Sequence, residues 1–231
     1  MCLETPPKGV MKTLGVIPAR GGSKGIPRKN IKLLNGKPMV QYTIEACQKS
    51  NLDKFVVSTE DEEIREICEG LGAEVLPRPS ELATDAAQAA DAVVDVCRRV
   101  EGYDIGLMLQ PTSPLRNEIY INEALDVYDR GKFESVISVG MFKHFVWVLG
   151  LQCPYPLNYD PFHRRPRRQD KLTDFIENGA MYIFKIDNLL RSGCMIYGRI
   201  GFYIMPDEAC IEVDDPYSFF LAEQTMKSWL K

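Results

Sequence analysis

The sequence predicts an α/β protein built on a doubly wound, mostly parallel sheet. Short, continuous apolar runs alternate with segments of helical apolar spacing, in units of about thirty residues, as in parallel strands covered by helices on both faces. The first apolar run ends in a glycine-rich, basic loop that leads into a helical segment. A chain of 231 residues, 45% of them apolar, suits one such domain with a sizeable core.

The first half of the chain carries the clearest alternation. Apolar runs predict strands at residues 14–19, 55–58, 74–76 and 105–109. Apolar residues on one helical face predict helices at residues 38–49, at 61–69, and from Thr84 or Asp85 to about Val100. Gly70 and Gly72 end the second helix, and either Thr84 or Asp85 suits the N-cap of the third.

The second half keeps this rhythm except in one stretch. A helix at 122–130 and a strand at 135–139 precede the break, and strands at 180–184 and 200–205 and a helix at 216–230 follow it. Residues 141–176, with aromatics, four prolines and a basic run, have no clear period, which predicts an excursion from the sheet. The expected organisation is a tail at 1–11 and a single domain at 12–231.

Composition excludes several classes of function. The net charge of -4 argues against broad binding to nucleic acid or anionic membrane, and the thirteen-residue apolar run at 145–157 is too short for a membrane helix, which needs about 20 residues. The seven cysteines are odd in number and lack a C-x-x-C pair, so we expect buried thiols. No secretory signal is visible, which favours the cytoplasm, or the nucleus in a eukaryote.

The loop after the first strand, residues 18–30, carries the strongest chemical signal. It places three glycines and the cations Arg20, Lys24, Arg28 and Lys29 beyond the carboxyl end of a strand, where open α/β sheets bind ligands. Glycines let backbone N–H groups approach an anion, and cations neutralise a polyphosphate. The loop fits neither the P-loop nor the dinucleotide-binding pattern, so it predicts a nucleoside triphosphate site of another kind.

Further blocks extend this signal over nearly the whole chain from Lys12. After the loop with its V-I-P-A-R-G-G-S-K-G-I-P stretch come P-R-P at 77–79, L-A-T-D at 82–85, L-Q-P-T-S-P-L-R at 109–116, R-R-Q-D at 167–170, E-N-G-A at 177–180 and E-V-D at 212–214. In content and order these blocks resemble the acylneuraminate cytidylyltransferases, which make CMP-sialic acids. The resemblance implies a Rossmann-like fold of the nucleotide-diphospho-sugar transferase type.

The resemblance also implies a role for individual residues. The implied nucleotide contacts are Arg20, Gly22, Ser23, Lys24, Lys29 and Asn30 around the phosphates, and Arg78, Ala83 and Thr84 near the cytosine. The implied sugar contacts are Gln110, Arg168, Gln169, Asn178 and Gly179. Arg168 and Gln169 match a block that the family uses across a dimer interface, so the resemblance implies a homodimer or a dimer of dimers completed by the excursion.

Glu212 and Asp214 are the predicted metal ligands. Residues 212–215 are expected to end a strand, where alternation puts these two carboxylates on one side, and paired carboxylates suit magnesium, with manganese as the alternative. The family normally has Asp at both positions, so Glu212 departs from its pattern. Asp215 is instead expected to cap the final helix, which begins at Pro216. An acidic N-cap without any bound metal is the alternative interpretation of this segment.

The expected reaction joins a nonulosonic (sialic-type) acid to CMP from CTP and releases pyrophosphate. Arg20, Lys29 and Asp214 are the expected catalytic residues, acting by alignment and charge neutralisation. The alternatives within enzymes are a CMP-legionaminate, CMP-pseudaminate or 3-deoxy-D-manno-octulosonate cytidylyltransferase and an NDP-sugar pyrophosphorylase. The alternative of another class is a non-catalytic descendant that binds CTP or nucleic acid through the basic first loop and the arginines of residues 164–168.

Overall fold

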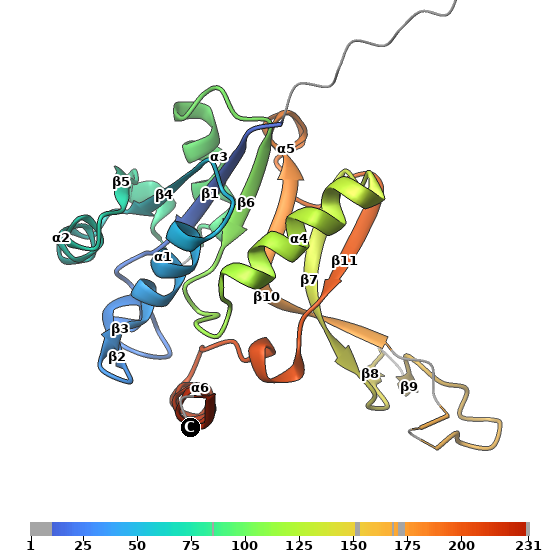
Figure 1. The fold of residues 1–231 in the computed structure, drawn as a ribbon. Coiled ribbons are helices and arrows are strands. Elements are labelled where there is room, and N and C mark those ends of the chain that lie inside the picture. Colours follow the sequence, from blue (N-terminus) through green and yellow to red (C-terminus); the bar gives the residue numbers. More distant parts are fainter. Residues whose placement is uncertain (1–10, 85, 151–152, 168, 171–173, 230–231) are drawn as a thin grey trace, which may run out of the picture.

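A seven-stranded sheet organises the protein. The structure is a computed structural model that describes residues 11–84, 86–150, 153–167, 169–170 and 174–229 (Figure 1). In spatial order the strands of the sheet are β11 (Ile200–Ile204), β7 (Ser135–Phe142), β10 (Asp174–Lys185), β6 (Ile105–Leu109), β1 (Thr13–Pro18), β4 (Lys54–Thr59) and β5 (Glu74–Pro77). The predicted tail lies almost wholly outside the described residues.

The sheet is mostly parallel, as predicted. β1 runs parallel to β4 and β6, β5 runs parallel to β4, and β11 runs parallel to β7. Only β10 is antiparallel to its neighbours within this sheet, β6 and β7. The carboxyl ends of β1, β4 and β6 therefore meet at one edge, and the residues just past the end of β6 face those in the middle of β10.

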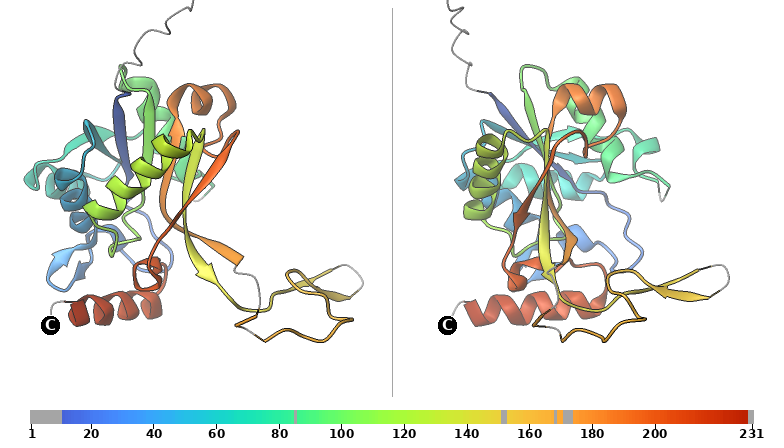
Figure 2. Two further views of the ribbon diagram at one scale, coloured as in Figure 1. Left: turned by 45° about the vertical axis from the view of Figure 1, so that its right-hand side comes forward. Right: turned by 90° about the vertical axis from the view of Figure 1, so that its right-hand side faces the viewer.

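Helices cover both faces of the sheet, as Figure 2 shows. The helices are α1 (Met39–Lys49), α2 (Glu62–Gly70), α3 (Ala89–Arg99), α4 (Glu118–Gly131), α5 (Ile186–Ser192) and α6 (Pro216–Trp229). Ile44 of α1 and Ile121 of α4 belong to the larger buried cluster, and Val93 of α3 and Leu189 of α5 belong to the smaller one. Burial of apolar residues on both faces explains why the strands appear as continuous apolar runs in the sequence.

Two predicted helix starts are wrong. The third helix begins at Ala89 instead of Thr84 or Asp85, because the Asp91 carboxylate accepts the backbone N–H of Gln88 at 2.9 Å and satisfies a donor at that start. Asp85 lies outside the described residues. The helix predicted at 122–130 begins four residues earlier, at Glu118, where the Asn117 side chain caps it by accepting the N–H of Tyr120 at 3.2 Å.

Several short elements were absent from the sequence prediction. They are α5, the hairpin of β2 (Leu33–Leu34) and β3 (Lys37–Pro38), the hairpin of β8 (Trp147–Leu149) and β9 (Pro154–Pro156), and the 3-10 turns η1 (Lys29–Ile31), η2 (Ser80–Leu82) and η3 (Asp207–Cys210). Elements of two to seven residues are too short to show a period in the sequence. Tertiary contacts decide their conformation.

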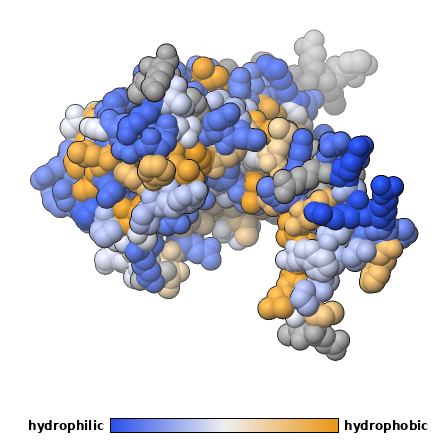
Figure 3. Space-filling view, turned by 90° about the horizontal axis from the view of Figure 1, so that it is seen from below, coloured by the Kyte–Doolittle hydropathy of each residue, from blue (hydrophilic) through white to orange (hydrophobic). Residues whose placement is uncertain are grey.

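The excursion forms an arm that stands out from the sheet (Figure 2). The predicted bounds of the excursion, 141–176, are too wide: β7 runs out to Phe142 and β10 begins at Asp174, so the ends of these two strands form the base of the arm. The described residues of the arm are 143–150, 153–167 and 169–170. Exposed apolar side chains are frequent there, and Phe162 is 94% exposed. Seen from the carboxyl edge (Figure 3), hydrophilic and apolar side chains lie side by side on the arm.

The cysteines differ in part from the expected buried thiols. Cys47, Cys68 and Cys97 are buried, and burial raises the pKa of each to about 12, but Cys153 and Cys194 are exposed. The six cysteines of the described segments are free thiols. Across those same segments, each helix is too short or too polar to cross a membrane.

We expect Gly106→Ala to destabilise the fold by about 1–3 kcal/mol, because a Cβ there would lie 2.3 Å from the Phe184 ring between β6 and β10. The matched control is Gly70→Ala in α2, where a Cβ would meet no atom within 4 Å, so stability should change by at most about 1 kcal/mol. Urea unfolding of both variants measures the difference. Equal midpoints would contradict the close packing of Gly106.

Candidate functional site

A cavity of about 240 Å³ opens at the carboxyl edge of the sheet. The predicted residues that line it are Arg20, Gly22, Ser23, Lys29, Asn30, Arg78, Gln110 and Asp214. They come from the first loop, from the segment after β5, from the loop after β6 and from the segment before α6. Lys24, Ala83, Thr84, Gln169, Asn178, Gly179 and Glu212 are not part of its lining, and Arg168 lies outside the described residues.

Two glycines let the first loop lie close to its neighbours. A Cβ on Gly21 would stand 2.3 Å from an Asp61 carboxylate oxygen, and one on Gly25 would stand 2.0 Å from the backbone oxygen of Asp214. No larger residue fits at either place without displacing the backbone or α2. The loop therefore lies between the N-terminus of α2 and the segment before α6.

Arg28 supports the loop and does not line the cavity. Its guanidinium pairs with Asp61, with one nitrogen 2.9 Å from Oδ1, and also with Glu63. The hydrogen bond from Arg28 holds the pKa of Asp61 below its ordinary value. One of the four cations predicted to serve the phosphates thus anchors the loop to α2.

Arg20 and Lys29 bring positive charge to the cavity. Lys29 Nζ lies 2.8 Å from Asp214 Oδ1, and the side chains of Lys29 and Asp214 are 13% and 65% exposed. Arg20 Nη1 donates to the backbone oxygen of Thr84 at 3.2 Å, while the Asn30 amide donates to the backbone oxygen of Arg20 at 2.8 Å. Asn30 is buried, so it fixes the backbone from which the Arg20 side chain extends.

Arg78 lies deeper than the other two cations. Its Nη2 donates to the backbone oxygen of Ser58 at 2.7 Å and its Nε to Ser58 Oγ at 3.2 Å. Burial lowers the pKa of Arg78, and Glu60, whose carboxylate is 4.0 Å from Nη1, opposes that shift. Glu60 also accepts the N–H of Gly21 at 2.7 Å, so one carboxylate connects Arg78 to the first loop.

Gln110 and Gly179 meet beside the cavity. The Gln110 amide nitrogen donates to the backbone oxygen of Gly179 at 2.8 Å. Gly179 has φ +68°, and a Cβ there would stand 2.8 Å from Glu212 Oε1. Both its left-handed backbone and its close neighbours call for glycine. Glu212 is half-buried, and burial first, then Asp214, raises its pKa.

The predicted strand at 212–214 is wrong. Those residues belong to no strand, and β11 ends at Ile204. The Val213 N–H donates instead to the backbone oxygen of Thr112 at 2.7 Å, which ties the segment to the loop after β6. Asp214 lines the cavity while Glu212 lies beside Thr112, with 3.5 Å between its Oε1 and Thr112 Oγ1. Asp215 caps α6 by accepting the N–H of Ser218 at 2.7 Å.

Asn178 is buried and forms hydrogen bonds inside the fold. Its Oδ1 accepts the Ser138 hydroxyl at 2.6 Å, and its Nδ2 lies 3.2 Å from the sulfur of Met205 and 3.3 Å from that of Cys210. These contacts hold the bulge between residues 177 and 182, where the pairing of β10 with β7 shifts. Gln169 is exposed on the arm, away from the cavity of its own chain.

Two groups of residues at the site escaped sequence reasoning. Ala87, Gln88 and Ala89 line the cavity, so the N-terminus of α3 contributes to its wall. The misplaced start of that helix concealed these three residues, because Gln88 is not among the residue types that commonly cap helices. The buried Arg116 side chain donates a hydrogen bond to the Gln110 carbonyl in the loop after β6. Its sequence context gives no sign that it is buried.

Comparison with known sequences finds a family model and curated relatives. The model described as cytidylyltransferase matches residues 14–216. The chain is 35% identical over 224 residues to N-acylneuraminate cytidylyltransferase B of Danio rerio, covering 95% of this chain and 52% of the relative. It is 33% identical over 220 residues to the Escherichia coli N-acylneuraminate cytidylyltransferase, covering 91% and 51%. The chain spans about half the length of these relatives.

Comparison with solved structures confirms the predicted α/β, Rossmann-like fold. CMP:2-keto-3-deoxy-manno-octonic acid synthetase complexed with CTP aligns with a TM-score of 0.72 at 19% identity, covering 94% of this chain and 99% of that one. 4-Diphosphocytidyl-2C-methyl-D-erythritol synthase of Anaerococcus prevotii aligns with a TM-score of 0.68 at 9% identity, covering 94% and 96%. Since the family model spans most of the sequence, the chain belongs to the cytidylyltransferase family.

Proposed function

We propose that the protein joins a nonulosonic (sialic-type) acid to CMP from CTP and releases pyrophosphate. One observation carries the proposal: the cavity at the carboxyl edge gathers Arg20, Lys29, Gln110 and Asp214 from three separate segments. The names of the curated relatives, N-acylneuraminate cytidylyltransferases, support the choice of sugar acid over the other acids considered.

The reaction depends mainly on neutralising the charge of the phosphates and on aligning the two substrates. The anomeric hydroxyl oxygen of the sugar acid attacks the α-phosphorus of CTP, a new P–O bond forms, the bond to pyrophosphate breaks, and the hydroxyl proton is released to solvent. Arg20 and Lys29 neutralise charge on the phosphates as it shifts toward the leaving group. Asn30 and Gly21 hold the loop that presents both cations. The cytosine lies toward Arg78, which the contacts with Ser58 keep in one orientation.

Magnesium fits the acidic residues at this cavity. Magnesium is bound through one or two carboxylates together with substrate phosphates and waters, so a full cage of protein ligands is not required. Asp214 offers an exposed carboxylate on the cavity wall, next to Lys29. Glu212 is the second carboxylate, but it lies beside Thr112 and Gly179. When bound, the metal would neutralise phosphate charge. Asp214 would hold it, and Glu212 would add negative charge close to that site.

The sugar acid is proposed to lie on the Gln110 side of the cavity. Gln110 and the backbone of Gly179 offer it hydrogen bonds, and Asn178 fixes the bulge that carries Gly179. A nonulosonic acid also has a carboxylate, for which a second chain would supply Arg168 and Gln169 from its arm. Arginine recognises a carboxylate well because its planar fork donates two parallel hydrogen bonds.

Exposed apolar surface supports a homodimer. On β11, Ile200, Phe202 and Ile204 are all partly exposed on one face, and the Phe202 ring lies 5.4 Å from that of Phe175 on β10. Large contiguous apolar patches on a protein surface mark interaction sites. In a two-fold dimer each arm would extend over the partner's cavity.

We also propose a cytoplasmic location for the protein. The free thiols in the described part of the chain support it.

Pyrophosphate release from CTP, assayed with each candidate sugar acid in turn, tests the proposal directly. We expect turnover with a nonulosonic acid, and we expect Arg20→Ala or Lys29→Ala to lower kcat/KM by a factor equivalent to about 3 kcal/mol, as for loss of an oxyanion-hole donor. The matched control is Arg130→Ala, an 80% exposed cation on α4 far from the cavity, which should retain activity. Near-normal rates in folded Arg20 and Lys29 variants would overturn the phosphate assignment.

The metal assignment gives an ordered prediction. A chelator should abolish turnover, and magnesium or manganese should restore it. Asp214→Asn should lose more activity than Glu212→Gln, because Asp214 lines the cavity and Glu212 does not. Asp215→Asn is the control, since asparagine also caps helices and should leave the rate nearly unchanged. The reverse order of the first two variants, or full activity in chelator, would contradict the assignment.

The dimer predicts complementation between inactive chains. Arg20→Ala and Arg168→Ala chains, mixed and allowed to exchange, should form heterodimers with one intact site, which draws Arg20 from one chain and Arg168 from the other. Mixing Arg20→Ala with Lys29→Ala is the control, because both changes affect the same part of each site and every site stays defective. Light scattering measures the oligomeric state. A monomer that turns over CTP would rule the arrangement out.

A further inference from the structure

Arg116 is a buried cation without a carboxylate partner among the described residues. It is 2% exposed, and it is the largest of the fully buried side chains in that part of the protein. Burial lowers the pKa of Arg116 to about 10, so the guanidinium remains charged at neutral pH. Burying a charge without an opposite charge is costly, and apolar residues of similar volume usually serve stability as well or better. Stability alone therefore explains Arg116 poorly.

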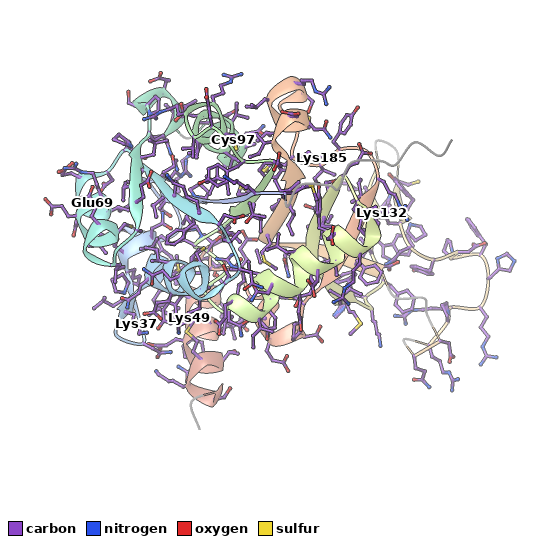
Figure 4. The ribbon with its side chains drawn as sticks, turned by 45° about the horizontal axis from the view of Figure 1, so that its top comes forward. Lys37, Lys49, Glu69, Cys97, Lys132 and Lys185 are labelled. Carbon is purple, nitrogen blue, oxygen red and sulfur yellow. The ribbon has the colours of Figure 1, made fainter. Side chains whose placement is uncertain are left out.

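The guanidinium binds three segments together. Nη1 donates to the backbone oxygen of Gln110 at 3.1 Å and to that of Ala180 at 2.6 Å, and Nη2 donates to Thr43 Oγ1 at 2.8 Å. Thr43 is buried on α1, the helix that runs from just after Lys37 to Lys49 (Figure 4). One side chain thus connects α1 with the loop after β6 and with β10.

The two carbonyl contacts lie where the sheet ends. Backbone pairing between β6 and β10 runs as far as Leu109 opposite Met181. The next residues, Gln110 and Ala180, are joined through Arg116 instead of through a ladder hydrogen bond. Directly beyond them the Gln110 side chain donates to the Gly179 carbonyl at 2.8 Å. Arg116 therefore continues the connection between the two strands up to the sugar side of the cavity.

We infer that Arg116 is the positioning residue for the sugar acid, acting through Gln110 and Gly179. The inference rests on the proposed function, in which those two residues contact the sugar. Arg116 itself is buried and is not part of the cavity lining, so it touches neither substrate. The planar fork of arginine donates to two carbonyls and a hydroxyl in fixed directions, which the single ammonium of a lysine does not reproduce.

Arg116→Lys tests the inference because it keeps the charge and loses the fork. We expect KM for the sugar acid to rise about tenfold, as for loss of one hydrogen bond from a charged donor, while KM for CTP stays within about twofold. Tyr203→Phe is the control for lost stability: it removes a 2.6 Å hydrogen bond to Glu123, remote from the cavity, and should leave both KM values unchanged. If Arg116→Lys does not fold, Arg116→Gln, which leaves no buried charge, replaces it.

A double-mutant cycle with Gln110→Ala separates positioning from general destabilisation. When Gln110 is already alanine, Arg116→Lys should have little further effect on the sugar KM. Additive effects, equal rises in both KM values, or failure of both Arg116 variants to fold would overturn the inference. A wild-type protein that releases no pyrophosphate with any nonulosonic acid would instead overturn the proposed function, so the two failures are distinguishable.

Discussion

The hydrogen bond from the Val213 N–H to the Thr112 carbonyl, 2.7 Å long, ties the segment before α6 to the loop after β6. The rest of the site depends on this bond because residues 212–215 have no strand to hold them. It places Asp214 beside Lys29 and Glu212 beside Gly179, so one attachment sets the relation between three distant parts of the sequence. A backbone hydrogen bond of this kind needs no particular side chain.

The glycines of the first loop supply the complementary condition. Gly25 lets the loop approach the backbone of Asp214, and Gly21 lets it approach Asp61 at the start of α2. Around these contacts each charged group has a partner that orients it: Arg28 with Asp61, Lys29 with Asp214, and Arg78 with Ser58 and, more distantly, Glu60. Partners within the fold thus fix the orientation of these charged groups, as catalysis by charge and alignment would require.

The sequence allowed the parallel core and the first loop to be predicted, because both are local signals. Strands such as β1 and β6 are continuous apolar runs, and the cations of the first loop follow β1 directly. Features that depend on contacts between distant segments were missed or misplaced. The irregular path of residues 212–214 and the buried position of Arg116 are each decided by partners far away in the chain. A hydrophobic pattern contains no information about such partners. The start of α3 was misplaced for another reason, because its local cap of Gln88 with Asp91 is of an uncommon kind.

β10 combines three tasks in one strand of twelve residues. Its second half completes the core of the sheet, its bulge carries Gly179, and its first half forms the root of the arm. Since side chains alternate between the two faces of a strand, loss of a single residue at the bulge would turn the outer half over and exchange its exposed and covered faces. The number of residues in β10 between the core and the arm therefore cannot change by even one. In relatives with the same architecture, insertions and deletions should occur at the tip of the arm instead of at its root.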